Sequence, residues 1–279
     1  QLERESALEQ ALSAGRDLWA EAAMHQPDGP SYAAFEHLLP PLRYVDTEFR
    51  HYPIVLSAPD RATKARYVSN GSGVNLLSTT PWWQVAGLVP VAFFVGAPAE
   101  PFGSEVARLH GPLLDGGWRP LVQTRYEVGG TAVEQEAFAS VEPPFDGADA
   151  SVFVRFRCCG EESASLRVRI GSGEELAAGG GLVRAATGRA LVWHARGWAW
   201  DNEQHELSIE LAPGATALLV VLTKGAELTA AAELDDATYR AHRAACVAYW
   251  NAVIAGAITL ETPAQRGDDA WKATLVGTL

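Results

Sequence analysis

The sequence has 279 residues, of which 48% are hydrophobic and 20% are charged, and its formal net charge at pH 7 is -12. This length and composition are typical of a soluble globular protein that buries a sizeable core, either as one large β domain or as two ordinary domains. The acidic balance argues against nucleic acid or an anionic membrane as a partner, because both bind basic patches that the sequence lacks, and no apolar run approaches the roughly 20 residues of a membrane-spanning helix.

Residues 1–26 have a helical composition. Leu8, Leu12 and Trp19 belong to a loose apolar stripe with a period of 3.6 residues, which ends at the Pro-Asp-Gly-Pro segment 27–30. We therefore interpret 1–40 as a leading helix and linker. The chain starts without a basic stretch followed by an apolar one, so we expect a signal peptide to be absent or already removed. The compartment stays open between the cytoplasm and a secreted or periplasmic location.

The character of the sequence changes after Pro40-Pro41. Short runs rich in Val, Ile, Tyr and Phe at 43–50, 53–56 and 65–68 predict β-strands. The Asn-Gly-Ser-Gly turn at 70–73 lacks the glycine spacing of a phosphate-binding loop, and no helical pattern follows it. We therefore assign no nucleotide to this turn.

The stretch 121–141 predicts a β-hairpin around which the rest of the chain is organised. Gly129 and Gly130 lie between two alternating runs and supply the positive φ angles that a two-residue turn requires. Such a turn places Arg125 opposite Glu134 and gives the hairpin one face that meets a core and one charged face. The core face holds Val122, Thr124, Tyr126, Val133, Ala137 and Ala139, and the charged face holds Gln123, Arg125, Glu127, Glu134 and Glu136.

The charged face has two interpretations. In the first, Glu127, Glu134 and Glu136 form a carboxylate cluster for general acid and base catalysis, because crowded carboxylates push one pKa upward. In the second, they lie on a solvated sheet face with a cross-strand Arg125–Glu134 pair. Alternation alone predicts the second interpretation, so the hairpin indicates architecture first.

Further short strands follow at even spacing. More than ten such strands with turn signals between them predict a mainly β fold, a large antiparallel two-sheet supersandwich over 41–232. The three cysteines fit neither a disulfide framework nor a zinc site, so we expect them to be small buried side chains and expect no metal. The later strands are predicted at 151–158, 165–170, 182–186, 190–195, 206–211 and 215–222.

The helical period returns at Asp235, where negative charge favours a helix start. An apolar stripe runs down to Gly256, and we interpret 233–261 as a linker helix. The stripe consists of Tyr239, Cys246, Tyr249, Trp250, Val253 and Ile254. The Thr-Pro-Ala-Gln segment that begins 262–279 has the spacing of a capping box. This second amphipathic pattern has no C-cap at the last residue, so we expect the sequence to be a fragment of a longer protein.

Four motifs in this order resemble those of a known family. From about residue 46 to the end, the pattern resembles the N-terminal supersandwich domain of bacterial six-hairpin glycosidases and the entry into their (α/α)6 barrel. The motifs are W…Y-x-x-G-G-x-x-x-x-Q-x-x-F from Trp118 to Phe138, I-x-L-A-P-G at 209–214, Y-W at 249–250 and T-P-A-Q…D-A-W-K-A-x-L from 262 to 275.

The resemblance implies that 262–279 is the first helix of a truncated (α/α)6 barrel of the same chain, against which the sandwich packs. It also implies that the parent is a glycoside hydrolase of the inverting type, in which one carboxylic acid protonates the glycosidic oxygen while another carboxylate activates a water. In the family those carboxylates lie in the barrel, so we assign no catalytic residue and no cofactor to this chain. We expect a non-catalytic domain that helps to shape the barrel, with homodimer formation as a further option.

Tryptophans are the residues that we predict to contact an oligosaccharide. Trp198 and Trp200 lie beside amide and carboxylate side chains, a mixture that stacks on sugar rings and binds hydroxyls, and Trp82, Trp83 and Trp118 are further candidates. The alternative is that these indoles pack in cores or domain interfaces. A galactose-mutarotase-like domain that binds or epimerises sugar on its own also stays open, although no spacing among the seven histidines nominates a catalytic pair.

Overall fold

The computed structural model describes Ser13, His25 and residues 52–58, 61–76, 87–97, 99–145, 148–258, 260–262 and 265–278. The chain divides into two units, 1–50 and 51–279. Ser13 is helical, but apart from Ser13 and His25 the predicted leading helix and linker lie outside the described residues. The fold described below is that of the unit 51–279.

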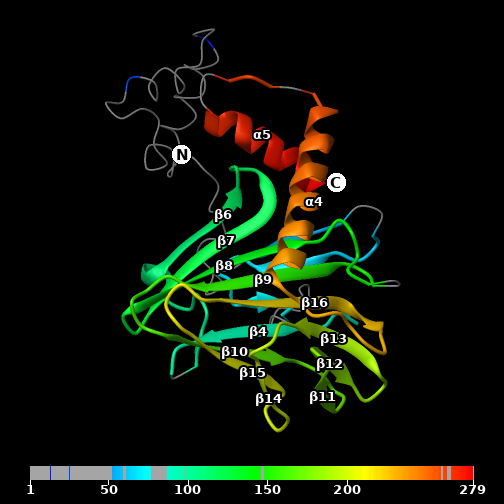
Figure 1. The fold of residues 1–279 in the computed structure, drawn as a ribbon. Helices are drawn as coiled ribbons and strands as arrows, with labels where there is room; N and C mark the ends of the chain where they lie inside the picture. Colours follow the sequence, from blue (N-terminus) through cyan, green and yellow to red (C-terminus); the bar gives the residue numbers. More distant parts are fainter. Residues whose placement is uncertain are drawn as a thin grey trace. The chain divides into compact units, whose positions relative to one another are not determined.

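The described residues of this unit form two antiparallel sheets of eight strands each, stacked face to face (Figure 1). The predicted fold class, a mainly β two-sheet sandwich, is therefore confirmed. Sheet 1 has the order β1-β2-β3-β4-β10-β15-β14, with β5 paired to β4. Its strands are β1 (Pro53–Leu56), β2 (Ala65–Val68), β3 (Gly73–Val74), β4 (Val91–Val95), β5 (Glu100–Pro101), β10 (Ala164–Ile170), β14 (Ala199–Asp201) and β15 (Glu206–Leu211).

Sheet 2 carries the predicted hairpin and has the order β11-β12-β13-β16-β9-β8-β7-β6. A short 3-10 helix, η2 (Val106–Arg108), leads into its edge strand β6. The strands are β6 (Leu109–Asp115), β7 (Arg119–Val128), β8 (Thr131–Ala139), β9 (Ser151–Cys158), β11 (Leu176–Gly179), β12 (Leu182–Ala185), β13 (Arg189–His194) and β16 (Thr216–Glu227).

The hairpin β7–β8 has the predicted register. Arg125 lies opposite Glu134 and Gln123 lies opposite Glu136. Gly129 and Gly130 have φ angles of 56° and 81°, which only glycine adopts without strain in a two-residue turn of this kind. The turn chemistry and the two-residue period therefore fix which side chains share a face.

The core between the two sheets is built from alternate residues of facing strands. Phe93 of sheet 1 meets Phe156 of sheet 2 edge to face, with ring centroids 5.2 Å apart. The Tyr67 hydroxyl crosses the same space and donates to Gln135 Oε1 at 2.5 Å. The predicted core face of the hairpin is confirmed, because its six side chains are all buried in or against this core.

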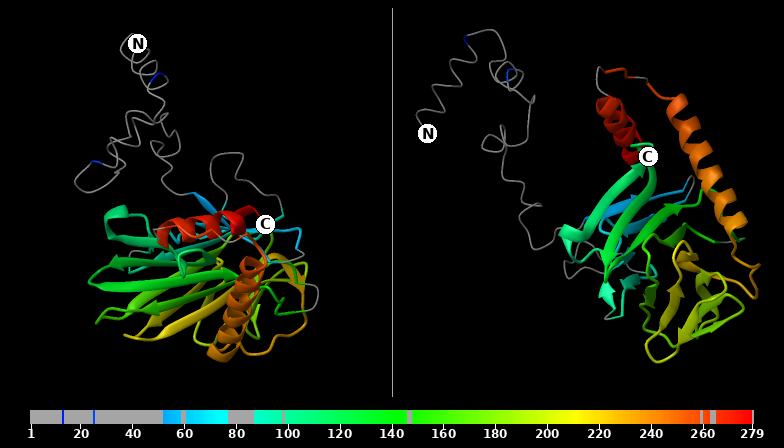
Figure 2. Two further views of the ribbon diagram at one scale, coloured as in Figure 1. Left: turned by 90° about the horizontal axis from the view of Figure 1, so that it is seen from above. Right: turned by 60° about the vertical axis from the view of Figure 1, so that its left-hand side comes forward.

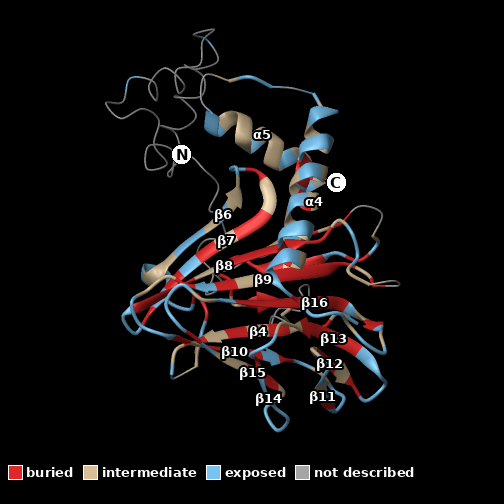
Figure 3. Cartoon of the chain, viewed as in Figure 1, coloured by how far each residue is buried: buried red, intermediate tan, exposed pale blue. Residues whose placement is uncertain are grey.

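A second core lies on the outer face of sheet 2, beneath the helix α4 (Asp236–Ala255). Buried residues run along β8, β9 and β16 below this helix in Figure 3. Sheet 2 is thus covered on both faces over part of its area, unlike an antiparallel sheet with one solvated face. The register aligns one apolar side chain from each of five strands into a row, the apolar row, consisting of Leu121, Phe138, Phe153, Val220 and Trp193.

Helix α4 begins where the sequence predicts. Asp235 is its N-cap, and the Asp235 carboxylate accepts a hydrogen bond from the Thr238 backbone N–H at 2.8 Å. The predicted stripe faces the sheet: Tyr239, Cys246 and Trp250 are the buried residues of α4, and the other three, Tyr249, Val253 and Ile254, are partly buried against the same core. These side chains complete the outer core over the apolar row.

The second helix, α5 (Gln265–Thr278), contacts β7 and α4, whereas α4 contacts β8 (Figure 2). Val276 is its buried apolar side chain among the described residues. Before the helix, Thr262 donates from both its backbone N–H and its hydroxyl to Asp268 Oδ1, at 2.7 and 2.8 Å. Both helices therefore lie against the outer face of sheet 2.

Candidate functional site

Two further rows of side chains, all polar except Leu113, continue the outer face of sheet 2 beyond the apolar row. We name them by what lies above them, because α4 crosses one row and leaves the other open. The covered row consists of Leu113, Gln123, Glu136 and Arg155, and the open row consists of His110, Arg125, Glu134 and Arg157.

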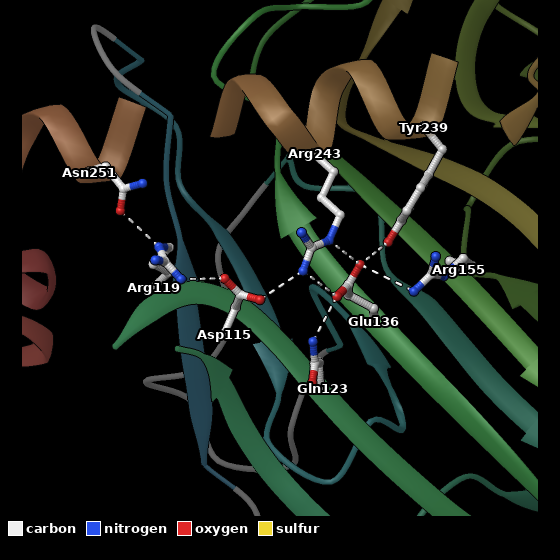
Figure 4. A network of polar contacts seen from close by, with 8 residues as sticks. All are labelled: Asp115, Arg119, Gln123, Glu136, Arg155, Tyr239, Arg243 and Asn251. Carbon is white, nitrogen blue, oxygen red and sulfur yellow. Dashed lines mark hydrogen bonds and ion pairs between the residues drawn. The ribbon is translucent and has the colours of Figure 1, made fainter. Parts of the chain in front are cut away.

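Glu136 is the centre of the covered row, and its side chain is only 5% exposed. From α4, the Tyr239 hydroxyl donates to Glu136 Oε1 at 2.5 Å and Arg243 Nε donates to the same oxygen at 2.9 Å. Within the row, Gln123 Nε2 donates to Glu136 Oε2 at 2.8 Å. Figure 4 shows these donors converging on the carboxylate from the helix and from β7.

The network extends from Glu136 to a second carboxylate and to the far end of α4. Arg243 Nη2 donates to Asp115 Oδ1 at 2.8 Å, and Asp115 Oδ2 accepts from Arg119 Nη1 at 2.7 Å. Arg119 Nε then donates to Asn251 Oδ1 at 3.0 Å (Figure 4). The helix is therefore fastened to β6, β7 and β8 at positions two helical turns apart.

The electrostatics of this network keep Glu136 ionised. Burial acts to raise the pKa of the Glu136 carboxyl, but the hydrogen bonds from Arg243, Tyr239 and Gln123 outweigh burial and hold that pKa below its usual value. Burial and the adjacent carboxylate together raise the pKa of the Tyr239 hydroxyl. A carboxylate that stays charged near neutral pH, with its oxygens already occupied by donors, is suited to holding structure and unsuited to protonating a leaving group.

The structure changes the expectation for the charged face in two respects. Glu136 was expected on a solvated face, but α4 buries it. The expected Arg125–Glu134 pair is replaced by two others, because Arg125 Nη2 lies 3.7 Å from Glu127 Oε1 and Arg157 Nη1 lies 3.8 Å from Glu134 Oε2. The solvated interpretation describes the open row, where these arginines and glutamates remain substantially exposed.

A hollow of about 310 Å³ lies on this face, lined by the side chains of both rows. Its arginines make only long contacts to carboxylates, since Arg155 Nη2 lies 3.5 Å from Glu136 Oε1 and the other two contacts are longer. Charge-assisted hydrogen bonds in proteins are typically about 2.7–2.9 Å long. The open side of sheet 2 therefore combines a hollow with guanidinium groups that are only loosely paired.

The predicted tryptophan positions do not form one site. Trp118 is 7% exposed in the outer core, whereas Trp198 is 9% exposed in the core between the sheets and donates to the Leu218 carbonyl. Trp200 is half-buried and stacks on His205 with ring centroids 6.3 Å apart. Trp82 and Trp83 lie outside the described residues. A sugar-binding role for these residues stays a prediction.

Ser140 and His242 form the one close serine–histidine pair of the described residues, with Oγ and Nδ1 2.6 Å apart. Ser140 is only 2% exposed, and its hydroxyl also donates to the Glu142 carbonyl at 2.5 Å. The His242 ring stacks on Phe153 at 4.5 Å. The pair therefore joins α4 to the end of β8 and gives substrate no access to the serine.

The described residues contain no group of three or more His, Cys, Asp or Glu side chains placed to hold a metal ion. Their helices are also too short or too polar to cross a membrane. All three cysteines are free. Cys158 and Cys246 are buried as expected, whereas Cys159 is only partly buried.

The sequence-based interpretation missed Arg243 and Asp115, which complete the network around Glu136. One signal was present for Arg243: it follows Tyr239 by four residues and precedes Cys246 by three, so it lies on the apolar stripe of α4. A cation in a buried stripe implies an anion opposite it. Comparison of the chain with known protein-family models and with curated proteins gives no match.

Proposed function

We propose that this chain is a non-catalytic β-sandwich module of a carbohydrate-active enzyme, a glycoside hydrolase of the inverting type, and that the module packs on and shapes a helical catalytic barrel. The carbohydrate assignment rests on the resemblance of the hairpin and helix motifs to six-hairpin glycosidases. The barrel would supply the carboxylic acid and the carboxylate that inversion requires.

The observation that supports this proposal is the attachment of α4 to the outer face of sheet 2. An apolar core and a buried ionic network hold the same helix, at Trp250 and at Arg243. Burial of the apolar core supplies most of the free energy that holds the helix on the sheet. The network fixes the position of the helix, because the hydrogen bonds to Glu136 form only at one helix position. A sheet built in this way is suited to present helices in a fixed place.

The chemistry of the covered row supports the non-catalytic part of the proposal. Glu136 is ionised and its oxygens accept hydrogen bonds from Arg243, Tyr239 and Gln123. General acid catalysis needs a carboxyl group that holds a proton near the working pH. The most buried carboxylate of this face therefore acts in binding the helix.

The reading frame that encodes these residues provides the test. We expect this reading frame to continue into a helical region whose loops carry an acidic pair. We also expect the full-length protein to hydrolyse oligosaccharides with inversion of configuration at the anomeric carbon, which proton NMR of the released sugar would detect. A frame without such a region, or a product that retains configuration, would refute the proposal.

A sugar-epimerising function of the chain alone is favoured by one observation. His110 Nε2 lies 3.5 Å from Glu127 Oε1 at the hollow's edge, so an imidazole and carboxylates share an open face. Polarimetry on freshly dissolved α-D-glucose and α-D-galactose separates the two functions. If the chain is a non-catalytic module, the 279-residue chain should not accelerate mutarotation. Acceleration that is lost in the His110→Ala variant would favour the epimerising function.

A further inference from the structure

We propose that the hollow lined by the two rows binds the carboxylate or phosphate group of a small polyhydroxylated ligand, through Arg125 and Arg157 of the open row and Arg155 of the covered row. This assignment does not depend on the proposed function, because it concerns a site that the helices leave open. The hollow is lined by these arginines together with Gln123, His110 and Glu134.

The charge of the lining favours an anion. Three arginines face two carboxylates, and one of these, Glu136, already has Arg243 of α4 as a counterion at 2.9 Å. Three guanidinium groups therefore face Glu134 inside the hollow and Glu127 at its edge, which leaves one positive charge in excess. This positive hollow lies on a chain whose net charge is -12.

The guanidinium groups also have unused donors. Their contacts to carboxylates are 3.5–3.8 Å long, and in the described part of the chain none of the three groups donates a hydrogen bond to protein. A guanidinium carries five N–H donors in a planar fork that matches carboxylate and phosphate oxygens. An anion in the hollow would satisfy donors that the protein leaves loosely paired.

The register brings the three arginines around one point. Arg125 and Arg157 lie on either side of Glu134 in adjacent strands, which places their backbones roughly 10 Å apart at a strand spacing of about 4.8 Å. Arg155 precedes Arg157 by two residues on the same face of β9, roughly 7 Å along the strand. Arginine side chains of this length can reach a common anion from these three positions.

The other groups of the lining suit hydroxyls. Gln123 offers an amide, His110 an imidazole and Glu134 an acceptor, whereas Leu113, 63% exposed, forms an apolar edge. A hollow of about 310 Å³ lies at the small end of ligand sites in proteins. A monosaccharide acid or sugar phosphate combines the anionic and hydroxyl groups that these side chains recognise.

Calorimetric titration of the 279-residue chain tests the proposal, with D-glucuronate, D-glucose 6-phosphate and D-glucose as probes at low and high salt. We expect at least one of the two anions to bind, and neutral glucose to bind at least about tenfold more weakly, since a hydrogen bond to a charged group is worth about that factor. Binding of the anion should weaken as salt rises. The stronger of the two anions identifies carboxylate or phosphate as the recognised group.

Variants separate recognition from a structural role. Arg125→Gln and Arg157→Gln should each weaken anion binding about tenfold, whereas the control Arg167→Gln, on β10 of sheet 1 and 3.8 Å from Glu206, should not change it. Glu134→Gln should strengthen anion binding, because it removes the carboxylate that pairs with Arg157 and lowers the negative charge inside the hollow. Thermal melting confirms that each variant folds. Failure of both anions to bind at millimolar concentration, equal binding of glucose, or weaker anion binding by Glu134→Gln would overturn the proposal.

Discussion

Glu136 is an ionised side chain that folding removes from water almost completely. Such a group is costly to bury unless donors replace its hydration, and here Tyr239, Arg243 and Gln123 do so. Two of these donors come from α4, more than 100 residues away in the chain. The carboxylate and the helix therefore depend on each other.

Replacing Arg243 should destabilise the protein strongly. Arg243→Met leaves Glu136 buried without its main counterion, and we expect the free energy of unfolding in urea to fall by about 3 kcal/mol. Arg240→Met on the same helix is the matched control, because Arg240 is 72% exposed and lies 3.9 Å from Asp236, so its loss should cost less than about 0.5 kcal/mol. Equal losses for the two variants would mean that the network contributes nothing specific.

Gly71 should not tolerate a side chain. Its φ is 83°, and an added Cβ would lie 2.6 Å from Gln135 Oε1 and 2.8 Å from the Phe102 ring, at the centre of the core between the sheets. Gly71→Ala should therefore combine backbone strain with overpacking and cost about 3 kcal/mol or more. Gly214→Ala has a similar φ of 77° and nothing within 4 Å, so it should show only the strain of about 1 kcal/mol. Comparable melting temperatures for the two variants would contradict the steric argument.

From the sequence, one can predict which residues of the hairpin lie opposite each other more reliably than which of them are buried. The opposition of Gln123 and Glu136 follows from a two-residue turn and a period of two. The burial of Glu136 does not, because it depends on a helix that arrives from a distant part of the chain. Leu121 and Phe138 held a clue, since two apolar residues at the end of an otherwise charged face imply that something covers that end.

At the scale of elements, α4 is fastened to sheet 2 at its first half by His242 as well as by Arg243. The His242 ring lies against Phe153 and contacts Ser140 at the end of β8. Burial lowers the pKa of His242, although Glu142 acts in the opposite direction. The neutral imidazole is therefore the form that the folded helix accommodates.

Acid should loosen this attachment. A folded-state pKa below the unfolded value of 6.5 means that the unfolded chain binds the proton more readily, so stability is present above pH 6.5 and falls as the pH drops below it. His242→Gln should reduce the slope of the unfolding free energy between pH 7.5 and pH 5, measured in urea. Burial also lowers the pKa of His194 in β13, so His194→Gln is measured alongside. An unchanged slope in His242→Gln would show that this histidine does not couple to folding.

For the whole molecule, local patterns predict the strands but not their neighbours. Evenly spaced short runs predict a two-sheet sandwich, and β7–β8 pair through a glycine turn. In contrast, β10 lies between β4 and β15, and β16 lies between β13 and β9. These pairings join segments that are far apart in the chain, and the packing of two complete faces decides them. The same long-range packing determines that Trp118 and Trp198 fill cores on opposite sides of sheet 2.

The outer core makes the sandwich dependent on α4, and truncation should reveal this dependence. A chain that ends at Asp235 loses Tyr239, Cys246 and Trp250, and exposes the apolar row of sheet 2. We expect it to bind a hydrophobic dye and to associate in sedimentation experiments, because an exposed apolar patch of this kind promotes aggregation. A chain that ends at Ala257 is the matched control, because it keeps α4 and loses α5, whose buried apolar side chain among the described residues is Val276. It should associate no more than the full chain does and show only a small drop in melting temperature. A monomeric Asp235 truncation that melts at the wild-type temperature would show that sheet 2 is stable without its helix.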